Sequence, residues 1–286
     1  GGKAMREFIF EDVRQRYAAE PISLLSSHLL NDPVSTAMRT ATSTDESDLM
    51  AVVNGDGTAA LLVTLREQNI TGFVQASTDG LIKETASIDL GTLYFVVERE
   101  IAGETRRFVE RFNSGRYLDC SIVIEPGAPT DTFAVPHLEG KTVWAMVDGS
   151  PAETAVVSGG QITLTKDVES RVEIGLNFEP QIRDLPIRGD EREHLRLSEQ
   201  QRVVSVELDL FETGTVDLAA NGQPAIFVPL RTLGGDLLDV PMEERLYTGR
   251  KQIEGLLDYA EGGQVEITQS VPGPLTIRSI RKEVEI

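Results

Sequence analysis

The amino-acid sequence predicts a mainly β protein with an antiparallel, propeller-blade-like meander, small barrel or sandwich domains, and one short helix near the N-terminus. Short runs of Val, Ile, Leu, Phe and Tyr recur, and Gly, Asp or Pro corners separate them, as is typical of sandwiches, barrels and propellers. Asp-Gly pairs, which favour tight hairpin turns, stand at Asp56-Gly57, Asp79-Gly80 and Asp148-Gly149.

The first strands follow from these turns. The meander is predicted from four strands at 49–54, 58–66, 70–77 and 81–89. A further hairpin is predicted from strands 93–101 and 105–112, which flank Ala102-Gly103-Glu104.

One helix is expected, at about residues 21–31, with the sequence PISLLSSHLLN. Pro21 suits a first helical position, and Ile22, Leu25 and Leu29 share one face at helical spacing. His28 lies on this helix, where we expect it to pack or to cap.

The later strands are equally regular. Val204, Val206, Leu208 and Leu210 alternate with polar residues, the period of a half-buried strand. Residues 264–286 predict two more strands around Pro272-Gly273-Pro274, and alternating charges on the last one protect a sheet edge.

Three domains are expected. Residues 5–116 form a propeller-blade-like β domain with the helix, 117–186 form a small barrel or sandwich domain, and 187–286 form a C-terminal β domain. A turn-rich stretch at 125–132 and the prolines Pro180 and Pro186 mark changes of character. A second arrangement stays open, in which the first and last segments make one discontinuous domain with 117–186 inserted.

Composition limits the function. The net charge is −19, from 27 basic and 46 acidic residues, whereas gripping nucleic acid needs clustered Lys and Arg. No apolar run approaches the roughly 20 residues that cross a bilayer, so we expect no membrane insertion. The single cysteine, Cys120, argues against a disulfide-stapled domain, and we expect it to be a buried small side chain.

One stretch raises the possibility of an enzyme. Gly55-Asp56-Gly57-Thr58-Ala59-Ala60 matches a relaxed dinucleotide fingerprint, and Asp79 follows about twenty residues later. That fingerprint requires a helix whose N-terminus holds the pyrophosphate. Residues 62–65 suit a strand better, so we predict a hairpin turn here. An enzyme that uses a nucleotide or a pair of acidic residues stays open as one hypothesis for the function.

No other chemical constellation stands out. His28, His137 and His194 lie far apart, and no His pair has zinc-ligand spacing. The chain lacks an Asp-x-Asp-x-Asp-Gly calcium loop and a G-x-S-x-G serine elbow, and no carboxylate pair is distinguished among 46 acids. Trp144 is expected in the core. We therefore predict no enzyme and no catalytic, cofactor-binding or metal-binding residues.

Several segments in series resemble the tail tubular protein B, or nozzle, family of short-tailed bacteriophages and prophage tails. They are REFIFEDVRQRYAAEPISLLSSHLL (6–30), DGTAALLVTLREQNITGFVQASTDGLIKETASI (56–88), LYFVVEREIAGETRRFVERF (93–112), LDCSIVI (118–124), HLEGKTVWAMVDGSPAETAVVSGGQITL (137–164) and the closing segment 247–286. Their order is the family's order. Because family members are usually about twice as long, the chain resembles their C-terminal half.

The resemblance implies a structural protein of the virion tail, made in the bacterial cytoplasm. In the family, six copies form a ring of propeller-like and barrel-like domains below the portal and adaptor, together with fibre proteins. DNA leaves through this conduit without being gripped, and an acidic wall that repels phosphate suits that role. The alternative is a carbohydrate- or receptor-binding β module.

Overall fold

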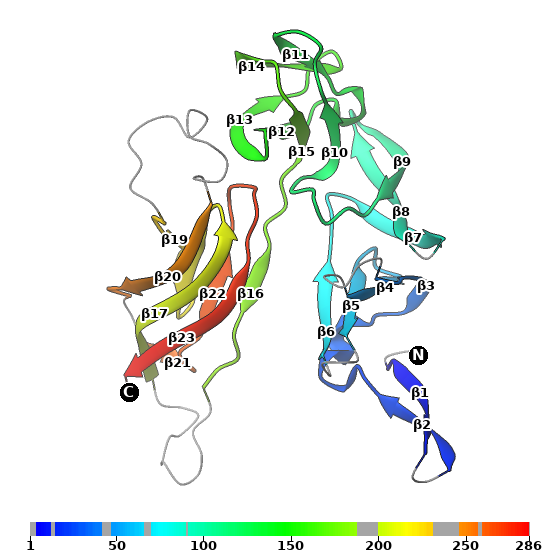
Figure 1. The fold of residues 1–286 in the computed structure, drawn as a ribbon, viewed down its shortest axis with the longest axis vertical. Coiled ribbons are helices and arrows are strands. Elements are labelled where there is room, and N and C mark those ends of the chain that lie inside the picture. The colour runs from blue at the N-terminus through cyan, green and yellow to red at the C-terminus, as the bar shows by residue number, and fades with distance from the viewer. Residues whose placement is uncertain are drawn as a thin grey trace. The chain divides into compact units, whose positions relative to one another are not determined.

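The computed structural model describes residues 4–12, 15–41, 47–65, 70–89, 91–187, 200–230, 246–256 and 259–285. These residues form antiparallel strands and two short 3₁₀ helices, which confirms the predicted mainly β class (Figure 1). The chain divides into two compact units, residues 1–115 (unit 1) and 116–286 (unit 2). Among the described residues, no helix has the length and apolarity needed to traverse a bilayer. The three-domain division stays a prediction.

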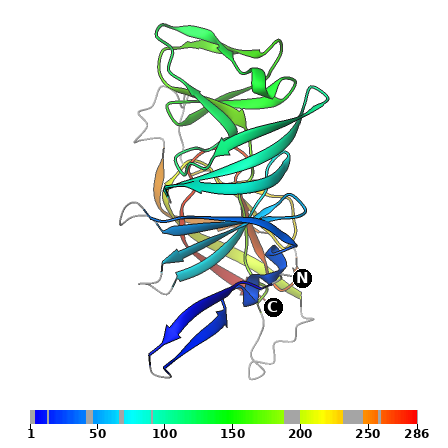
Figure 2. The same ribbon diagram turned by 90° about the vertical axis from the view of Figure 1, so that its right-hand side faces the viewer.

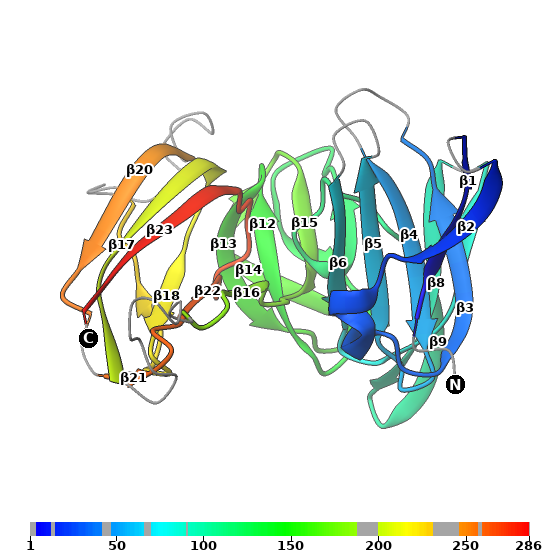
Figure 3. The same ribbon diagram turned by 90° about the horizontal axis from the view of Figure 1, so that it is seen from below.

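Unit 1 contains two larger sheets and a separate hairpin. The four-stranded sheet runs β3-β4-β5-β6, from strands β3 (Pro33–Arg39), β4 (Asp48–Asn54), β5 (Ala59–Leu65) and β6 (Ile70–Ala76). The three-stranded sheet comprises β7 (Leu81–Ile88), β8 (Thr92–Ile101) and β9 (Glu104–Arg111). β1 (Arg6–Glu11) pairs with β2 (Arg16–Pro21). Figure 3 shows β6, β5, β4 and β3 side by side.

The predicted membership of the four-stranded meander is wrong at one strand. β3 takes the fourth place, whereas the expected strand 81–89 is β7, which pairs with β8 in the other sheet. Asp79-Gly80 is therefore a crossover between sheets and not a hairpin turn. Arg99 of β8 fixes the crossover by donating a 2.7 Å hydrogen bond from Nη1 to the Asp79 carbonyl. A Cβ at Gly80 would lie 2.5 Å from the Glu98 carbonyl oxygen, so the crossover approaches β8 too closely for any other residue.

The core of unit 1 lies between its two sheets. Leu49 and Ala51 of β4 and Leu61 of β5 pack with Leu93 of β8 in one cluster. Val53 and Ala59 pack with Ile82 and Val97 in a second cluster. The opposite face of β4 and β5 is covered by Leu30, with Met5 and Leu29 packed beside it. Side chains that alternate along β4 therefore serve two different hydrophobic layers.

The predicted N-terminal helix exists in a shorter form. The 3₁₀ helix η1 spans Leu24–Leu29, and Ser26 within it has non-helical backbone angles. Pro21 ends β2 and does not begin the helix. The expected buried face is wrong, because Leu25 is 91% exposed. This segment is too short and too irregular to bury residues at 3.6-residue spacing.

Three of the expected hairpin turns are confirmed. Asp56-Gly57 lies in the turn between β4 and β5, and Ala102-Gly103 joins β8 to β9. Asp148-Gly149 joins β12 (Thr142–Val147) to β13 (Ser150–Val156). Both residues of the Asp148-Gly149 loop have positive φ, 49° and 75°, as type I′ turns require.

Unit 2 begins with two small sheets. The four-stranded sheet runs β10-β15-β12-β13, where β10 is Asp119–Ile124 and β15 is Val172–Leu176. The second sheet pairs β11 (Thr130–Ala134) with β14 (Gln161–Val168). The 3₁₀ helix η3 (Pro136–Leu138) follows β11.

The remaining strands of unit 2 form two sheets around one core. One sheet runs β16-β22-β18-β19, from strands Gln181–Arg183, Val265–Thr268, Asp217–Ala220 and Ile226–Phe227. In the other, β17 (Gln200–Thr213) pairs with β20 (Tyr247–Glu254), β21 (Ala260–Glu261) and β23 (Ile277–Glu285). Leu208, Leu218 and Ile267 are among the buried residues between them. The two strands expected in 264–286 are confirmed.

The alternation predicted for β17 changes phase within the strand. Val206, Leu208 and Leu210 are buried as expected, but Val203 is buried in place of Val204. The pairing with β23 shifts register between Val203 and Ser205. A bulge of this kind inserts one residue and therefore reverses which side chains face the core.

Because the bulge decides which valine is buried, Val203→Ala should cost about 2 kcal/mol of unfolding free energy through lost burial and a cavity. Val204→Ala should cost less than about 1 kcal/mol, since that side chain is half-buried. Urea unfolding of the two variants measures the difference. Equal losses would contradict the observed register.

Arg99 provides a second test, since its side chain is fully buried and makes a bidentate pair with Glu110, at 2.9 Å from Nε and from Nη2. Arg99→Met should cost about 3–5 kcal/mol, because it leaves a carboxylate without its partner. Arg107→Met is the matched control: it removes an exposed pair with Glu98, worth at most about 1 kcal/mol. Urea unfolding, with hydrogen exchange of β8 and β9, compares them, and similar losses would refute a special role for Arg99.

Candidate functional site

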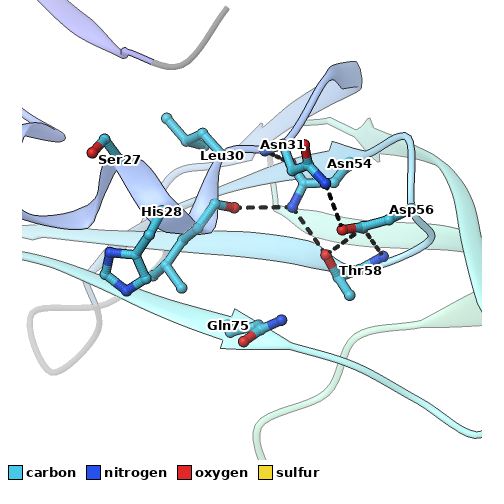
Figure 4. Close-up of a pocket in the computed structure, with 9 residues that line it drawn as sticks. Ser27, His28, Leu30, Asn31, Asn54, Asp56, Thr58 and Gln75 are labelled. Atoms are coloured by element: carbon cyan, nitrogen blue, oxygen red, sulfur yellow. Dashed lines mark hydrogen bonds between the residues drawn. The ribbon is translucent and has the colours of Figure 1, made fainter.

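The Gly55-Asp56-Gly57 turn lies beside a pocket of about 300 Å³ (Figure 4). The end of β4 brings Asn54 to one wall, the turn before β5 brings Thr58, and the segment after η1 brings Asn31. His28 of η1 and Gln75 of β6 also line it, and Figure 4 shows them apart from the hydrogen-bonded group. This is the place where a phosphate would lie if the turn were a nucleotide loop.

The backbone amides of the turn are already used within the chain. The Gly55 amide donates to the carbonyls of Asn31 and Asp32, at 3.2 and 2.9 Å. The Gly57 amide donates to the Asn54 carbonyl at 3.1 Å. Phosphate loops instead aim such amides at the ligand, so these two are not available for that role.

The polar side chains of the pocket bind one another. Asn54 Nδ2 donates to the Leu29 carbonyl at 2.9 Å and to Thr58 Oγ1 at 3.0 Å. Its Oδ1 accepts from the Asn31 amide at 3.0 Å. Asn54 is buried, and it thereby ties the segment after η1 to the hairpin. The network explains the polar pocket as a structural joint.

No helix follows the turn, because residues 59–65 form β5. Gly57 has φ +87°, and a Cβ there would lie 2.6 Å from Leu81 Cδ2. Its carbonyl accepts from the Ile82 amide at 2.9 Å. The glycine therefore serves the close approach of the turn to β7, and the prediction of a hairpin in place of a nucleotide loop is confirmed.

Asp56 is held in its ionised form. Hydrogen bonds from the Asn31 side chain, then from the Thr58 hydroxyl and amide, lower the pKa of Asp56 below its ordinary value of 3.8. The corresponding distances are 3.0, 2.7 and 3.0 Å. A fixed negative charge at the rim disfavours a phosphate ligand.

A second pocket, of about 590 Å³, is lined by residues of β7 and β8 together with Gly55 and Arg107. Its carboxylate Glu98 lies 2.9 Å from Arg107 Nε and 3.8 Å from Lys83 Nζ. Glu98 is therefore neutralised by two cations. Glu98 thus belongs to a charge cluster with Arg107 and Lys83, and a second carboxylate, Glu84 of β7, lines the same pocket.

The two histidines that the structure describes lie in different units of the chain. His28 is exposed on η1, His137 lies in η3, and His194 falls outside the described residues. His137 Nε2 donates to the Cys120 carbonyl at 3.1 Å, so it approaches the backbone and not the thiol. Within the described part of the chain, no three His, Cys, Asp or Glu side chains form a metal-type cluster.

Two packing expectations need correction. Cys120 is half-buried and not buried, because it has φ +50° where the pairing of β10 with β15 shifts register. Trp144 is also half-buried, whereas its neighbours Val143 and Met146 are buried. Neither residue belongs fully to the core.

Among the described residues of unit 2, the most enclosed carboxylate is Glu173 on β15, which is 3% exposed. Ser121 Oγ donates to it at 2.9 Å, and Arg116 and Arg171 lie 3.6 and 3.8 Å away. Burial, and next the charge of Glu173, raises the pKa of Tyr117 above 10.0. Sequence reasoning missed this cluster, because β10 and β15 lie about fifty residues apart.

Comparisons with known proteins add no family. No protein-family model and no curated protein matches the chain. Among solved structures, an α-xylosidase of glycoside hydrolase family 31 from Xanthomonas citri aligns at 6% identity with a TM-score of 0.15. The alignment covers 88% of this chain but 35% of the xylosidase. A likeness of this size carries no argument about function.

The Asp56 network predicts a pH-dependent contribution to the stability of unit 1. Because the folded pKa is lowered, the stabilisation is present above the ordinary pKa of 3.8 and is lost as the pH falls through the folded value. Asp56→Ala should therefore lower Tm at pH 7, and the difference from wild type should shrink in strong acid. Thermal unfolding across this range measures it. Asp131→Ala, in unit 2, is the control, and a difference that persists unchanged in acid would contradict the network.

Proposed function

We propose that this chain is an architectural protein of a bacteriophage or prophage tail, part of the nozzle through which DNA leaves. Copies assemble into a ring, six-fold in the related family, that joins portal, adaptor and fibre proteins. The observation that carries the proposal is the ordered series of family-like segments from 6–30 to 247–286. The role requires no turnover.

The site geometry supports a passive role. The backbone amides of the Gly-rich turn and the Asn54 side chain donate hydrogen bonds to carbonyl groups of the same chain. The Glu98 carboxylate forms ion pairs with Arg107 and Lys83. The polar groups of both pockets thus hold strands together. An architectural protein needs such joints, because its sheets must keep their shape under load.

The negative net charge of the chain supports the proposed role as a DNA conduit. A net charge of −19 repels the phosphate backbone, and screening over about 8–10 Å at physiological salt confines that repulsion to DNA near the wall. A conduit with this property lets DNA slide without being retained.

A carbohydrate- or receptor-binding module is the second candidate, and one observation favours it. Phe8, Phe10 and Tyr17 are exposed together on the β1–β2 hairpin, and exposed aromatic rings are common platforms for ligands. Phe8 and Tyr17, however, stack on each other at 4.8 Å and 3°, which uses one face of each ring. Binding on a glycan array that is lost in Phe8→Ser would favour this candidate over the tail role.

Electron microscopy tests the tail role. Negatively stained particles of the protein should include rings with a central pore, either alone or when it is joined to the N-terminal half that members of the resembled family carry. Particles that remain single at every concentration in both forms would refute the proposal.

DNA binding gives an independent test. Duplex DNA should not be retained by the protein at physiological salt, because the acidic surface cannot release counterions from phosphate. Electrophoretic mobility of labelled DNA measures this, with a basic DNA-binding protein as positive control. Micromolar binding that weakens steeply with salt would contradict a passive conduit.

A further inference from the structure

The edge strand β6 lacks the devices within a strand that keep edges from pairing, namely charges, prolines and bulges, although η1 contacts it. It ends its sheet, and its seven residues, ITGFVQA, include no charged residue and no proline. Its register with β5 is continuous, so no bulge twists the edge away. An extended edge of this kind readily accepts a strand from another chain.

The other terminal strands that the structure describes each differ from β6 in at least one of these features. β3 and β13 contain prolines, Pro33 and Pro151, and bulges. β7, β10 and β11 have bulges, and β16, β19 and β21 have three residues or fewer. The remaining ones, β1, β2, β9, β14, β20 and β23, carry charged side chains. β6 is the exception within this part of the chain.

β6 also carries apolar side chains beyond the layer that covers its sheet. Val74 lies opposite Leu61, and Ile70 lies opposite Leu65, so both face the side that holds the core. Leu61 is buried, yet Val74 is 51% and Ile70 is 47% exposed. A Cβ at Gly72, between them, would meet nothing within 4 Å. The apolar face of the sheet therefore continues past its cover.

The β1–β2 hairpin also exposes large apolar side chains. It pairs with no other described strand, and Figures 1 and 2 show it extending away from the sheets of unit 1. Phe8, Phe10 and Tyr17 share one face and are 71%, 45% and 63% exposed. A hairpin on its own is marginally stable in water.

The root of the hairpin is fixed although its aromatic face is exposed. The Ile22 amide donates to the Met5 carbonyl at 3.1 Å, and the Met5 amide donates to Ser23 Oγ at 2.8 Å. Met5 also packs beside the Leu30 cluster. The hairpin is therefore an anchored arm and not a frayed end.

We propose that β6 of one copy receives the β1–β2 hairpin of a second copy, which extends the four-stranded sheet and lays its aromatic face over Ile70 and Val74. Strands of six and seven residues match in length. The contact joins two different surfaces, so each copy donates one hairpin and receives another. Such head-to-tail contacts build a ring when the rotation closes. The interface deepens the assembly proposed above and rests on it.

Charge favours a second copy as the occupant. Residues 6–21 contain three arginines and four acidic residues, so the hairpin contributes −1 to a chain of net charge −19. It is thus nearly neutral, and it meets a strand that has no charge. This pairing would bring two highly acidic chains together through two segments that carry little net charge.

The exposed area of the three aromatic rings sets the expected strength of the contact between two copies. At about 200 Å² per aromatic side chain, the three rings offer on the order of 350 Å² of exposed surface. One contact is then at the weak end of protein interfaces. Association should depend on concentration, and ring closure should reinforce it through two contacts per copy.

Mixing two variants tests the interface. Phe8→Ser/Tyr17→Ser disables the donor, and Val74→Lys disables the receiving edge. By analytical ultracentrifugation each variant alone should be monomeric at concentrations where wild type associates. A mixture should form 1:1 dimers, because one intact hairpin can still meet one intact β6. Matched controls are Phe227→Ser and Val109→Lys, which alter an exposed aromatic and an exposed strand valine elsewhere. Circular dichroism checks that all variants fold.

Several outcomes would overturn the interface. Wild type that stays monomeric at its highest soluble concentration excludes it, as does association that persists in either variant. Variants that fail to complement indicate hairpin-to-hairpin stacking, and glycan binding by the hairpin indicates a sugar ligand in its place. Rings that persist in both variants would refute this interface but leave the tail role standing. Complementation without rings in micrographs would support the interface and refute the ring.

Discussion

Face-to-face burial of two antiparallel sheets is the interaction on which unit 1 depends. Leu61 and Leu93 meet between the sheets, and this layer forms only if the chain crosses from β6 to β7 at the right place. Arg99 fixes that crossing through the Asp79 carbonyl and Glu110. A fully buried guanidinium is tolerated because two hydrogen-bonded partners compensate its desolvation. Position in the fold, and not chemistry toward a ligand, thus explains why the charged side chain of Arg99 is buried.

The same packing accounts for what remains uncovered. A three-stranded sheet covers a four-stranded one incompletely, so Ile70 and Val74 emerge at the uncovered end. The aromatic face of the β1–β2 hairpin is likewise exposed, apart from the stacking of its own rings. In an isolated monomer, the apolar residues of β6 and the aromatic face of the hairpin both stay exposed to solvent. In a series of copies joined head to tail, the hairpin of one copy would cover β6 of the next.

Local signals were readable from the sequence, and long-range ones were not. The turns at Asp56-Gly57 and Asp148-Gly149 depend on residues with access to positive φ, and they were predicted correctly. Asp79-Gly80 has the same local signal, yet Arg99, twenty residues later, makes it a crossover. The phase change at Val203 depends on a bulge opposite β23. The joint of Asn31 with Asn54 and the exposed edge of β6 likewise require knowledge of which strands are neighbours.

The central claim is that copies of this chain complete one another's sheets. Hydrogen exchange of backbone amides, followed by mass spectrometry at rising protein concentration, tests it most directly. If copies pair in this way, amides of Ile70–Ala76 and of the β1–β2 hairpin should gain protection together, while those of the charged edge β9 should not change. Larger particles in which β6 and the hairpin exchange as fast as in the monomer would contradict it.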